Sequence, residues 1–158
     1  MKTIAKISAC IACLAILLAL WYVITLRLSL SASVTVTPAS KDREAFEAIK
    51  DDIRSGKYGK IEVPGSAEDW SFVTVKVEIK SYSPFKTEWI SLTHDGAKDA
   101  ITVDQNTWIR EIDAFGKLEG DDAMTVTLLT KDPDAIRTAQ LEYYIYGRYQ
   151  MLETKLKR

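Results

Sequence analysis

The chain has 158 residues, with 21 lysine and arginine residues, 22 aspartate and glutamate residues and an apolar content of 47%. This length and composition suit one folded domain with an appendage, and they exclude a disordered chain, a collagen and a cysteine-stapled miniprotein. Charge is unevenly distributed, because Lys2, Lys6 and Arg27 all precede Asp42, the first acidic residue. The rest of the chain is therefore net acidic, and a clustered basic face for nucleic acid is not expected.

Residues 7–26 form an uncharged stretch, ISACIACLAILLALWYVITL. A helix of this length rises about 30 Å, enough to cross the hydrocarbon core of a bilayer. Trp21 and Tyr22 lie towards one end, where aromatic rings favour the headgroup region. We interpret the stretch as an uncleaved transmembrane signal-anchor. The competing interpretation is a cleavable signal peptide, whose apolar stretch is shorter, about 7–15 residues.

The charges that flank this stretch predict its orientation. Lys2, Lys6 and the amino terminus outweigh Arg27 on the other side. The positive-inside rule therefore places residues 1–6 in the cytoplasm and the rest of the chain outside the cytoplasmic membrane, with a single pass. Both cysteines, at positions 10 and 13, fall inside the span, where we expect them to pack as small apolar side chains. The outer domain must then be stable without disulfides, which favours a prokaryotic-style envelope domain.

Two segments are expected between the span and the β-rich part of the chain. Residues 27–40 are rich in serine and threonine and predict an extended stalk, with a first strand through Val34 and Val36 as the alternative. Residues 41–56 predict an amphipathic helix with Ser40 as its N-cap. The apolar stripe of this helix follows at helical spacing and consists of Phe46, Ile49 and Ile53.

From residue 57 to residue 153 the hydrophobic period changes from 3.6 to 2, which is typical of strands with one buried face. The fold class predicted is mainly β, an antiparallel immunoglobulin-like β-sandwich. The predicted strands are residues 73–80, 89–93, 100–103, 107–114, 124–129 and 141–151. Residues 94–96, His-Asp-Gly, are expected to form a turn, and residues 154–158 a basic tail.

Two runs of sequence carry a resemblance to a known kind of protein. Residues 73–85, VTVKVEIKSYSPF, look like the opening of bacterial envelope domains with an immunoglobulin-like sandwich, in which a long strand ends in a serine-rich turn before proline. Residues 116–128, GKLEGDDAMTVTL, are similar to the loop that precedes a threonine- and valine-rich strand in those domains. The resemblance covers roughly residues 70–150, and it implies an architecture and a surface location but no chemistry.

Residue types that carry catalysis or bind metals are scarce. His94 is the only histidine, and beside Asp-Gly it is expected to be a solvated turn residue. Zinc normally needs several histidine or cysteine ligands, and the outer domain has no cysteine. Loop carboxylates such as Asp121 and Asp122 lack the spacing of a calcium-binding loop. We therefore assign no catalytic residue, metal ligand or cofactor.

The strongest candidate for a binding surface is the tyrosine-rich last strand, residues 141–151. Strand alternation places Tyr144, Tyr146 and Arg148 on the face opposite Tyr143, Ile145 and Tyr149. Tyrosine and arginine are enriched at the centres of interfaces, so the first three are the predicted partner-binding residues. The helix of residues 41–54 covers this face in one alternative; in the other the strand lies open at an edge and binds a partner.

These expectations favour a membrane-anchored extracytoplasmic binding or assembly module without catalytic activity. Its predicted partners are the lipid bilayer, through residues 7–26, and another envelope protein or a second copy of the chain. One alternative is a secreted or anchored hydrolase that uses two carboxylates, one with a raised pKa in an apolar cleft. A less favoured alternative is a pilin-like subunit, because the chain lacks the expected processing site and Pro38 separates the span from the next helix.

Overall fold

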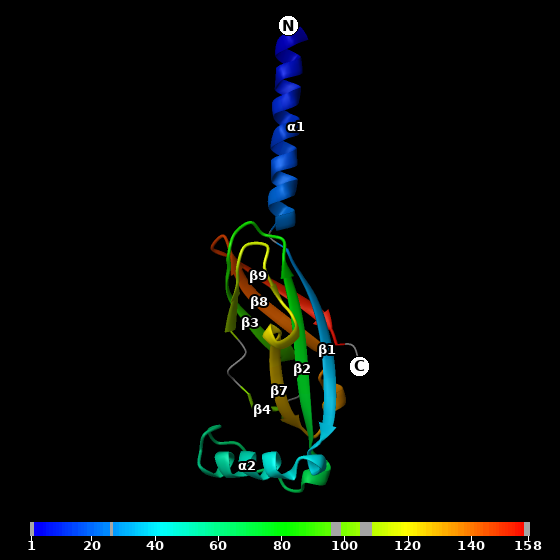
Figure 1. The fold of residues 1–158 in the computed structure, drawn as a ribbon, viewed down its shortest axis with the longest axis vertical. Coiled ribbons are helices and arrows are strands. Elements are labelled where there is room, and N and C mark those ends of the chain that lie inside the picture. Colours follow the sequence, from blue (N-terminus) through cyan, green and yellow to red (C-terminus); the bar gives the residue numbers. More distant parts are fainter. Residues whose placement is uncertain (1, 26, 96–98, 105–108, 157–158) are drawn as a thin grey trace.

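The fold is that of a computed structural model, which describes residues 2–25, 27–95, 99–104 and 109–156 (Figure 1). The helices are α1 (Lys2–Thr25) and α2 (Arg43–Arg54), with the short 3-10 helices η1 (Ala39–Lys41), η2 (Ala67–Asp69), η3 (Gly120–Asp122) and η4 (Pro133–Ala135). The strands are β1 (Leu28–Pro38), β2 (Ser71–Ser81), β3 (Thr87–Asp95), β4 (Ile101–Thr102), β5 (Ile109–Ile112), β6 (Lys117–Leu118), β7 (Met124–Thr130), β8 (Thr138–Ile145) and β9 (Arg148–Lys155).

Within the described residues the strands form two antiparallel sheets that enclose one core. One sheet has the order β1-β2-β7-β4, with β6 also paired to β2, and the other has the order β5-β3-β8-β9. Alternate residues of β2 are buried and meet buried residues of β3 and β8 in a common cluster, which includes Val73, Val75, Val77, Ile90, Leu92, Leu141 and Tyr143. The mainly β, antiparallel class predicted from the period-2 pattern is confirmed.

The segment predicted as a stalk forms β1 instead, the alternative that the sequence left open. It pairs with β2 along its whole length, from Leu28 opposite Ser81 to Pro38 opposite Ser71. Leu28 and Ala32 are buried on the inner face, while Ser29 and Ser31 between them are exposed. The stalk expectation fails because even a serine-rich segment forms a strand when its apolar residues alternate onto a core. No long spacer therefore separates α1 from the β domain.

The predicted amphipathic helix is α2, which is shorter than residues 41–56 and begins after a different cap. Asp42 is the N-cap, and its Oδ1 accepts a hydrogen bond from the Ala45 backbone N–H at 3.2 Å. Ser40 lies in η1, because the chain makes a 3-10 turn before the helix starts. The predicted stripe of α2 is buried in a second cluster at the end of the β domain remote from α1 (Figure 1), together with Trp70, Ile101 and Leu129. The helix therefore does not cover the tyrosine-rich face.

The single last strand predicted for residues 141–151 is wrong, because the chain reverses at Tyr146 and Gly147. These two residues join β8 to β9 and have φ angles of 53° and 67°. Positive φ at both central residues is the geometry of the type I′ turn, which matches the twist of paired strands. The reversal puts Tyr144 directly opposite Tyr149 on neighbouring strands. A continuous strand would have put them on opposite faces.

Two other segments predicted as loop or tail belong to strands. The predicted turn at residues 94–96 is wrong for its first two residues, because β3 continues to Asp95, which pairs with Thr138 of β8. Its glycine lies outside the described residues. The predicted tail at residues 154–158 begins inside β9, which extends to Lys155. In both places pairing with β8 outweighs the local sequence preference.

Helix α1 projects from one end of the β domain (Figure 1). Its residues from Lys6 to Thr25 are long and apolar enough to cross a membrane by length and composition. Side chains from Lys6 to Leu20 are exposed, so α1 is not the core helix of the domain. Cys10 and Cys13 are free and exposed on this helix.

Candidate functional site

The predicted partner-binding residues make their contacts in two places, although Tyr144 and Tyr146 both line a hollow of about 290 Å³ beside Phe85. Tyr144 lies on the outer face of the sheet formed by β5, β3, β8 and β9. Tyr146 and Arg148 instead contact the end of α1, within the chain itself. The two places differ in what surrounds them.

On the outer face, Tyr144 is the middle member of an aromatic strip, which we define as Trp89, Tyr144 and Tyr149. The three rings come from the adjacent strands β3, β8 and β9. The Tyr144 ring centroid lies 5.7 Å from that of Trp89 and 5.7 Å from that of Tyr149, at interplanar angles of 61° and 63°. Such edge-to-face contacts are favourable between aromatic rings. The side chains remain 42%, 40% and 48% exposed in that order.

Trp89 reaches this face because β3 contains a bulge. The register of β3 shifts between Glu88 and Ser91 on the β8 side and between Thr87 and Ile90 on the β5 side. Thr87 and Ile90 are buried, and the two residues between them are both exposed. In a regular strand Trp89 would share the inner face with Thr87, two residues earlier. The bulge therefore turns the indole outward.

The conformation of Trp89 is costly. Its φ angle is 50°, in the left-handed region that bulky side chains rarely adopt. A residue in this region costs about 1–2 kcal/mol. Backbone strain of this kind concentrates at binding and catalytic sites, where the surrounding structure holds it in place. The bulge therefore holds an exposed indole in a strained backbone conformation.

An acidic neighbour gives the strip a polar edge. Packing of neighbouring groups raises the pKa of Tyr149, and the carboxylate of Glu142 acts in the same direction through its charge and a hydrogen bond. Glu142 lies across from the exposed Met151 in the β8–β9 ladder. The strip thus presents apolar rings and phenolic hydroxyl groups, beside one carboxylate and one flexible thioether. Partner proteins commonly bind such a mixture.

Tyr146 and Arg148 connect the β8–β9 turn to α1. The Tyr146 ring centroid lies 5.4 Å from that of Tyr22 and 4.6 Å from that of Phe85. The Arg148 guanidinium carbon lies 5.9 Å from the centroid of the Tyr22 ring, a cation–π distance. These two predicted site residues therefore join the helix to the domain.

The end of the domain remote from α1 contains a hollow of about 380 Å³ beside Trp70. Lys131 Nζ lies 5.2 Å from the centre of the Trp70 ring, and Asp99 accepts hydrogen bonds from Thr130 Oγ1 at 3.2 Å and the Lys131 backbone N–H at 2.8 Å. Two of the charged groups that line this hollow, Asp99 and Lys131, are thus already engaged within the fold. The hollow has the features of a structural junction between strands and loops.

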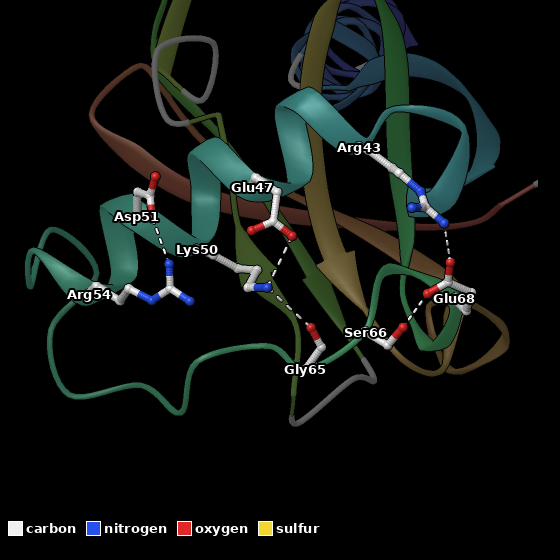
Figure 2. Close-up of polar contacts among 8 residues, drawn as sticks. All are labelled: Arg43, Glu47, Lys50, Asp51, Arg54, Gly65, Ser66 and Glu68. Atoms are coloured by element: carbon white, nitrogen blue, oxygen red, sulfur yellow. Dashed lines mark hydrogen bonds and ion pairs between the residues drawn. The ribbon is translucent and has the colours of Figure 1, made fainter.

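Charged side chains along α2 hold the loop that follows the helix in place (Figure 2). Lys50 Nζ lies 3.0 Å from Glu47 Oε1 and 3.4 Å from the Gly65 carbonyl oxygen, and Arg43 Nη2 lies 2.5 Å from Glu68 Oε1. Ser66 donates a hydrogen bond to Glu68, which lowers the pKa of that carboxyl. A general acid needs the opposite shift. Among the described residues, no group of three or more histidine, cysteine, aspartate or glutamate side chains has the arrangement of a metal site.

The sequence pattern indicates Tyr144 but not the other two members of the strip. Uninterrupted strand alternation predicts Tyr149 on the opposite face, because it counts Tyr146 and Gly147 as strand although they form a turn. The signal that was available is Gly147, since glycine is favoured at the second position of such turns. Trp89 had no comparable signal, because a bulge in β3 depends on how both neighbouring strands pair.

Together these observations define a mainly β protein with antiparallel sheets, joined to an apolar N-terminal helix that is long enough to span a bilayer. No protein-family model, curated protein or solved structure matches this chain. Its function is therefore argued from its own geometry.

Proposed function

We propose that this chain is an extracytoplasmic binding module, anchored in the cytoplasmic membrane by α1 and without catalytic activity of its own. The anchor is supported by the length and exposure of α1 and by the aromatic residues at its domain end. The orientation is supported by the positive charge that precedes the span. On this proposal the amino terminus is cytoplasmic and the β domain lies outside.

The domain belongs, on this proposal, to the immunoglobulin-like sandwiches. The order β1-β2-β7-β4 corresponds to strands A-B-E-D of that fold, and β5-β3-β8-β9 corresponds to C′-C-F-G. On this assignment, each of the two sheets that face each other across the core contains the strands of one sheet of an immunoglobulin-like sandwich. One feature departs from it, since the short β4 precedes β5 along the chain.

The binding surface on this proposal is the aromatic strip, and its occupant is the surface of another envelope protein or of a second copy. The observation that carries the proposal is the exposure of Trp89 by a strained bulge, next to two further exposed rings. Tryptophan and tyrosine dominate the binding energy of protein interfaces because they bury large areas and keep polar groups available. The bilayer is the second partner, through α1.

Site-specific photocross-linking in native membranes tests this function. Benzoylphenylalanine replaces Met151, which is exposed beside the strip, or Lys57, which is exposed at the remote end of the domain. We expect a discrete adduct from position 151 that is absent from position 57. An adduct of about twice 17.8 kDa identifies a second copy, and any other mass identifies a different protein.

The matched variants are Trp89→Ala and Tyr149→Ser within the strip and Ile61→Ser outside it, each in the chain with the probe at position 151. The strip variants are expected to lower the adduct yield at least tenfold, and the outside variant to leave it unchanged. Equal adducts from positions 151 and 57, or adducts insensitive to the strip variants, would overturn the proposed binding surface.

A further inference from the structure

The loops at the α1 end of the β domain carry exposed aromatic side chains. In Figure 1 the β2–β3 loop, the β5–β6 loop and the β8–β9 turn gather near the foot of α1. Tyr82 and Phe85 of the first loop are 45% and 51% exposed, and Phe115 of the second is 66% exposed. Among the side chains that the structure describes, Phe115 is the most exposed large apolar one. We call Tyr82, Phe85 and Phe115 the aromatic rim.

Backbone hydrogen bonds tie the two loops of the rim into one unit. The Phe115 N–H donates to the Ser83 carbonyl at 2.8 Å, and the Ser81 N–H donates to the Gly116 carbonyl at 2.9 Å. Ser83 is buried, and its Oγ accepts a hydrogen bond from the Phe85 N–H at 3.0 Å. The rim is therefore held in one arrangement and is not a set of independent loop tips.

Phe115 is exposed by a strained turn. Its φ angle is 53°, and a Cβ on the following Gly116 would lie 2.9 Å from the Asp113 carbonyl oxygen. Only glycine fits at position 116 without a shift of the backbone. The chain thus adopts a costly conformation whose result is a phenylalanine side chain in solvent. In water this arrangement is unfavourable twice, through strain and through apolar exposure.

The position of the rim relative to α1 indicates what covers it. Tyr22 near the end of α1 contacts Tyr146, and Tyr146 contacts Phe85 of the rim, so aromatic rings continue from the helix onto the domain. Aromatic side chains favour the headgroup region of a bilayer, where the apolar ring is covered and polar groups stay wet. The short helices at the opposite end of the domain instead carry acidic residues, namely Glu68, Asp69 and Asp134.

Basic residues near the rim have partners within the fold. Lys86 pairs with Glu111, and Lys117 pairs with Glu119. Lys80 Nζ lies 5.2 Å from the centre of the Tyr82 ring. These three lysines are therefore already engaged, so apolar burial is the main force at the rim, and not attraction of these lysines to anionic lipids.

We infer that the aromatic rim inserts into the headgroup region of the leaflet from which α1 emerges, so that the β domain rests on the bilayer and does not stand clear of it. This inference depends on the proposed anchoring by α1. It adds a second membrane contact, made by loops of the β domain, to the one made by the helix. Rings in this position also fix which sides of the domain face neighbours along the membrane.

Fluorescence quenching of the full chain in phosphatidylcholine vesicles tests the inference. Cys10 and Cys13 are replaced by alanine, and a single labelling site is introduced as Ala114→Cys, which is exposed beside the rim and leaves its rings intact. The matched site is Lys57→Cys at the remote end. A nitrobenzoxadiazole probe at position 114 is expected to be quenched by lipids with nitroxide near the top of the acyl chain. At position 57 the probe is expected to respond only to aqueous iodide.

Variants separate insertion from mere closeness to the membrane. With the probe at position 114, the double variant Phe85→Asp, Phe115→Asp is expected to lower lipid quenching at least fivefold. The control is Ile109→Asp, because Ile109 has a similar exposure but lies on the sheet, and it is expected to leave lipid quenching unchanged. Tyr82→Asp alone is expected to give an intermediate loss, and it serves if the double variant fails to fold. Raising the salt concentration should not release the probe from lipid.

A probe at position 114 that is as open to iodide as the one at position 57 would overturn the inference, as would quenching that is insensitive to the rim variants. Extraction of the same vesicles with alkaline carbonate distinguishes this failure from a failure of the anchor. If the chain resists extraction while the rim is exposed to water, the proposed anchor stands and the proposed rim contact is wrong. If the chain is extracted, the proposed anchor is wrong.

Discussion

The ring of Tyr146 lies 5.4 Å from the ring of Tyr22, although one residue is in the last β-turn of the chain and the other is near the end of its first helix. With β1 starting at Leu28, directly after α1, this contact leaves little freedom between the helix and the domain. A domain held in this way presents fixed faces towards the membrane and towards its neighbours.

Replacing Tyr146 by asparagine tests whether the ring contacts of Tyr146 fix the helix on the domain, separately from the stability of the β8–β9 hairpin. Asparagine tolerates the positive φ of position 146 better than tyrosine does, which should offset part of the stability that is lost with the ring of Tyr146. The same change removes both ring contacts at the junction. Distances between spin labels on α1 and on β8 should therefore broaden. A narrow, unchanged distance distribution would show that the ring contact does not fix the helix.

Two substitutions at Trp89 distinguish strain from binding. Trp89→Gly and Trp89→Ala both remove the indole, but only glycine relieves the strain of the φ angle of 50°. Part of this relief is offset by the greater freedom of glycine in the unfolded chain, so Trp89→Gly should be more stable than Trp89→Ala by about 0.5–1 kcal/mol. Urea unfolding measures the difference. An alanine variant more stable than the glycine variant would mean that the bulge is not strained.

The second core cluster should be essential for holding α2. Phe46 is fully buried there, and Phe46→Ala is expected to lower the free energy of unfolding by about 3–5 kcal/mol through the cavity it leaves. The exposed Phe85 provides the control, and Phe85→Ala should have a much smaller effect on the same measurement. Similar losses for both variants would contradict the packing of α2 against the domain.

Alkaline pH should destabilise the domain partly through Tyr143. Burial raises the pKa of this hydroxyl above its usual value of about 10. The unfolded chain then releases its proton first, so the stabilising effect is complete below about pH 10 and is lost as pH rises through the folded-state pKa. Tyr143→Phe should flatten the fall in unfolding free energy above about pH 10. A curve for this variant equal to that of the unsubstituted chain would exclude Tyr143 as the cause.

The sequence predicted those parts of the fold in which one rule dominates. Alternation along residues 73–80 identified β2 because every second side chain enters the core, and the stripe of Phe46, Ile49 and Ile53 identified α2 for the same reason. Where a local sequence preference competed with the geometry of the surrounding chain, the prediction from the local preference was wrong. Ser40 looked like a helix cap, but the 3-10 turn before α2 moved the cap to Asp42.

The candidate site was harder to predict than the fold. Tyr144 was found by its residue type, but its neighbours depend on a chain reversal at Gly147 and on the bulge at Trp89. Both features are set by the pairing of strands far apart in sequence, which no local pattern reports. Tyr146 and Arg148 contact Tyr22 of the same chain, and their role in binding a partner stays a prediction.

Labelling of intact spheroplasts most directly tests the central proposal, which is an uncleaved helical anchor with the domain outside. The full chain carries Lys57→Cys together with Cys10→Ala and Cys13→Ala, and spheroplasts are treated with a maleimide that does not cross membranes. The account predicts a labelled chain of the full 17.8 kDa in the membrane fraction. A chain that is labelled only after lysis, or a shorter labelled form in the soluble fraction, would contradict it.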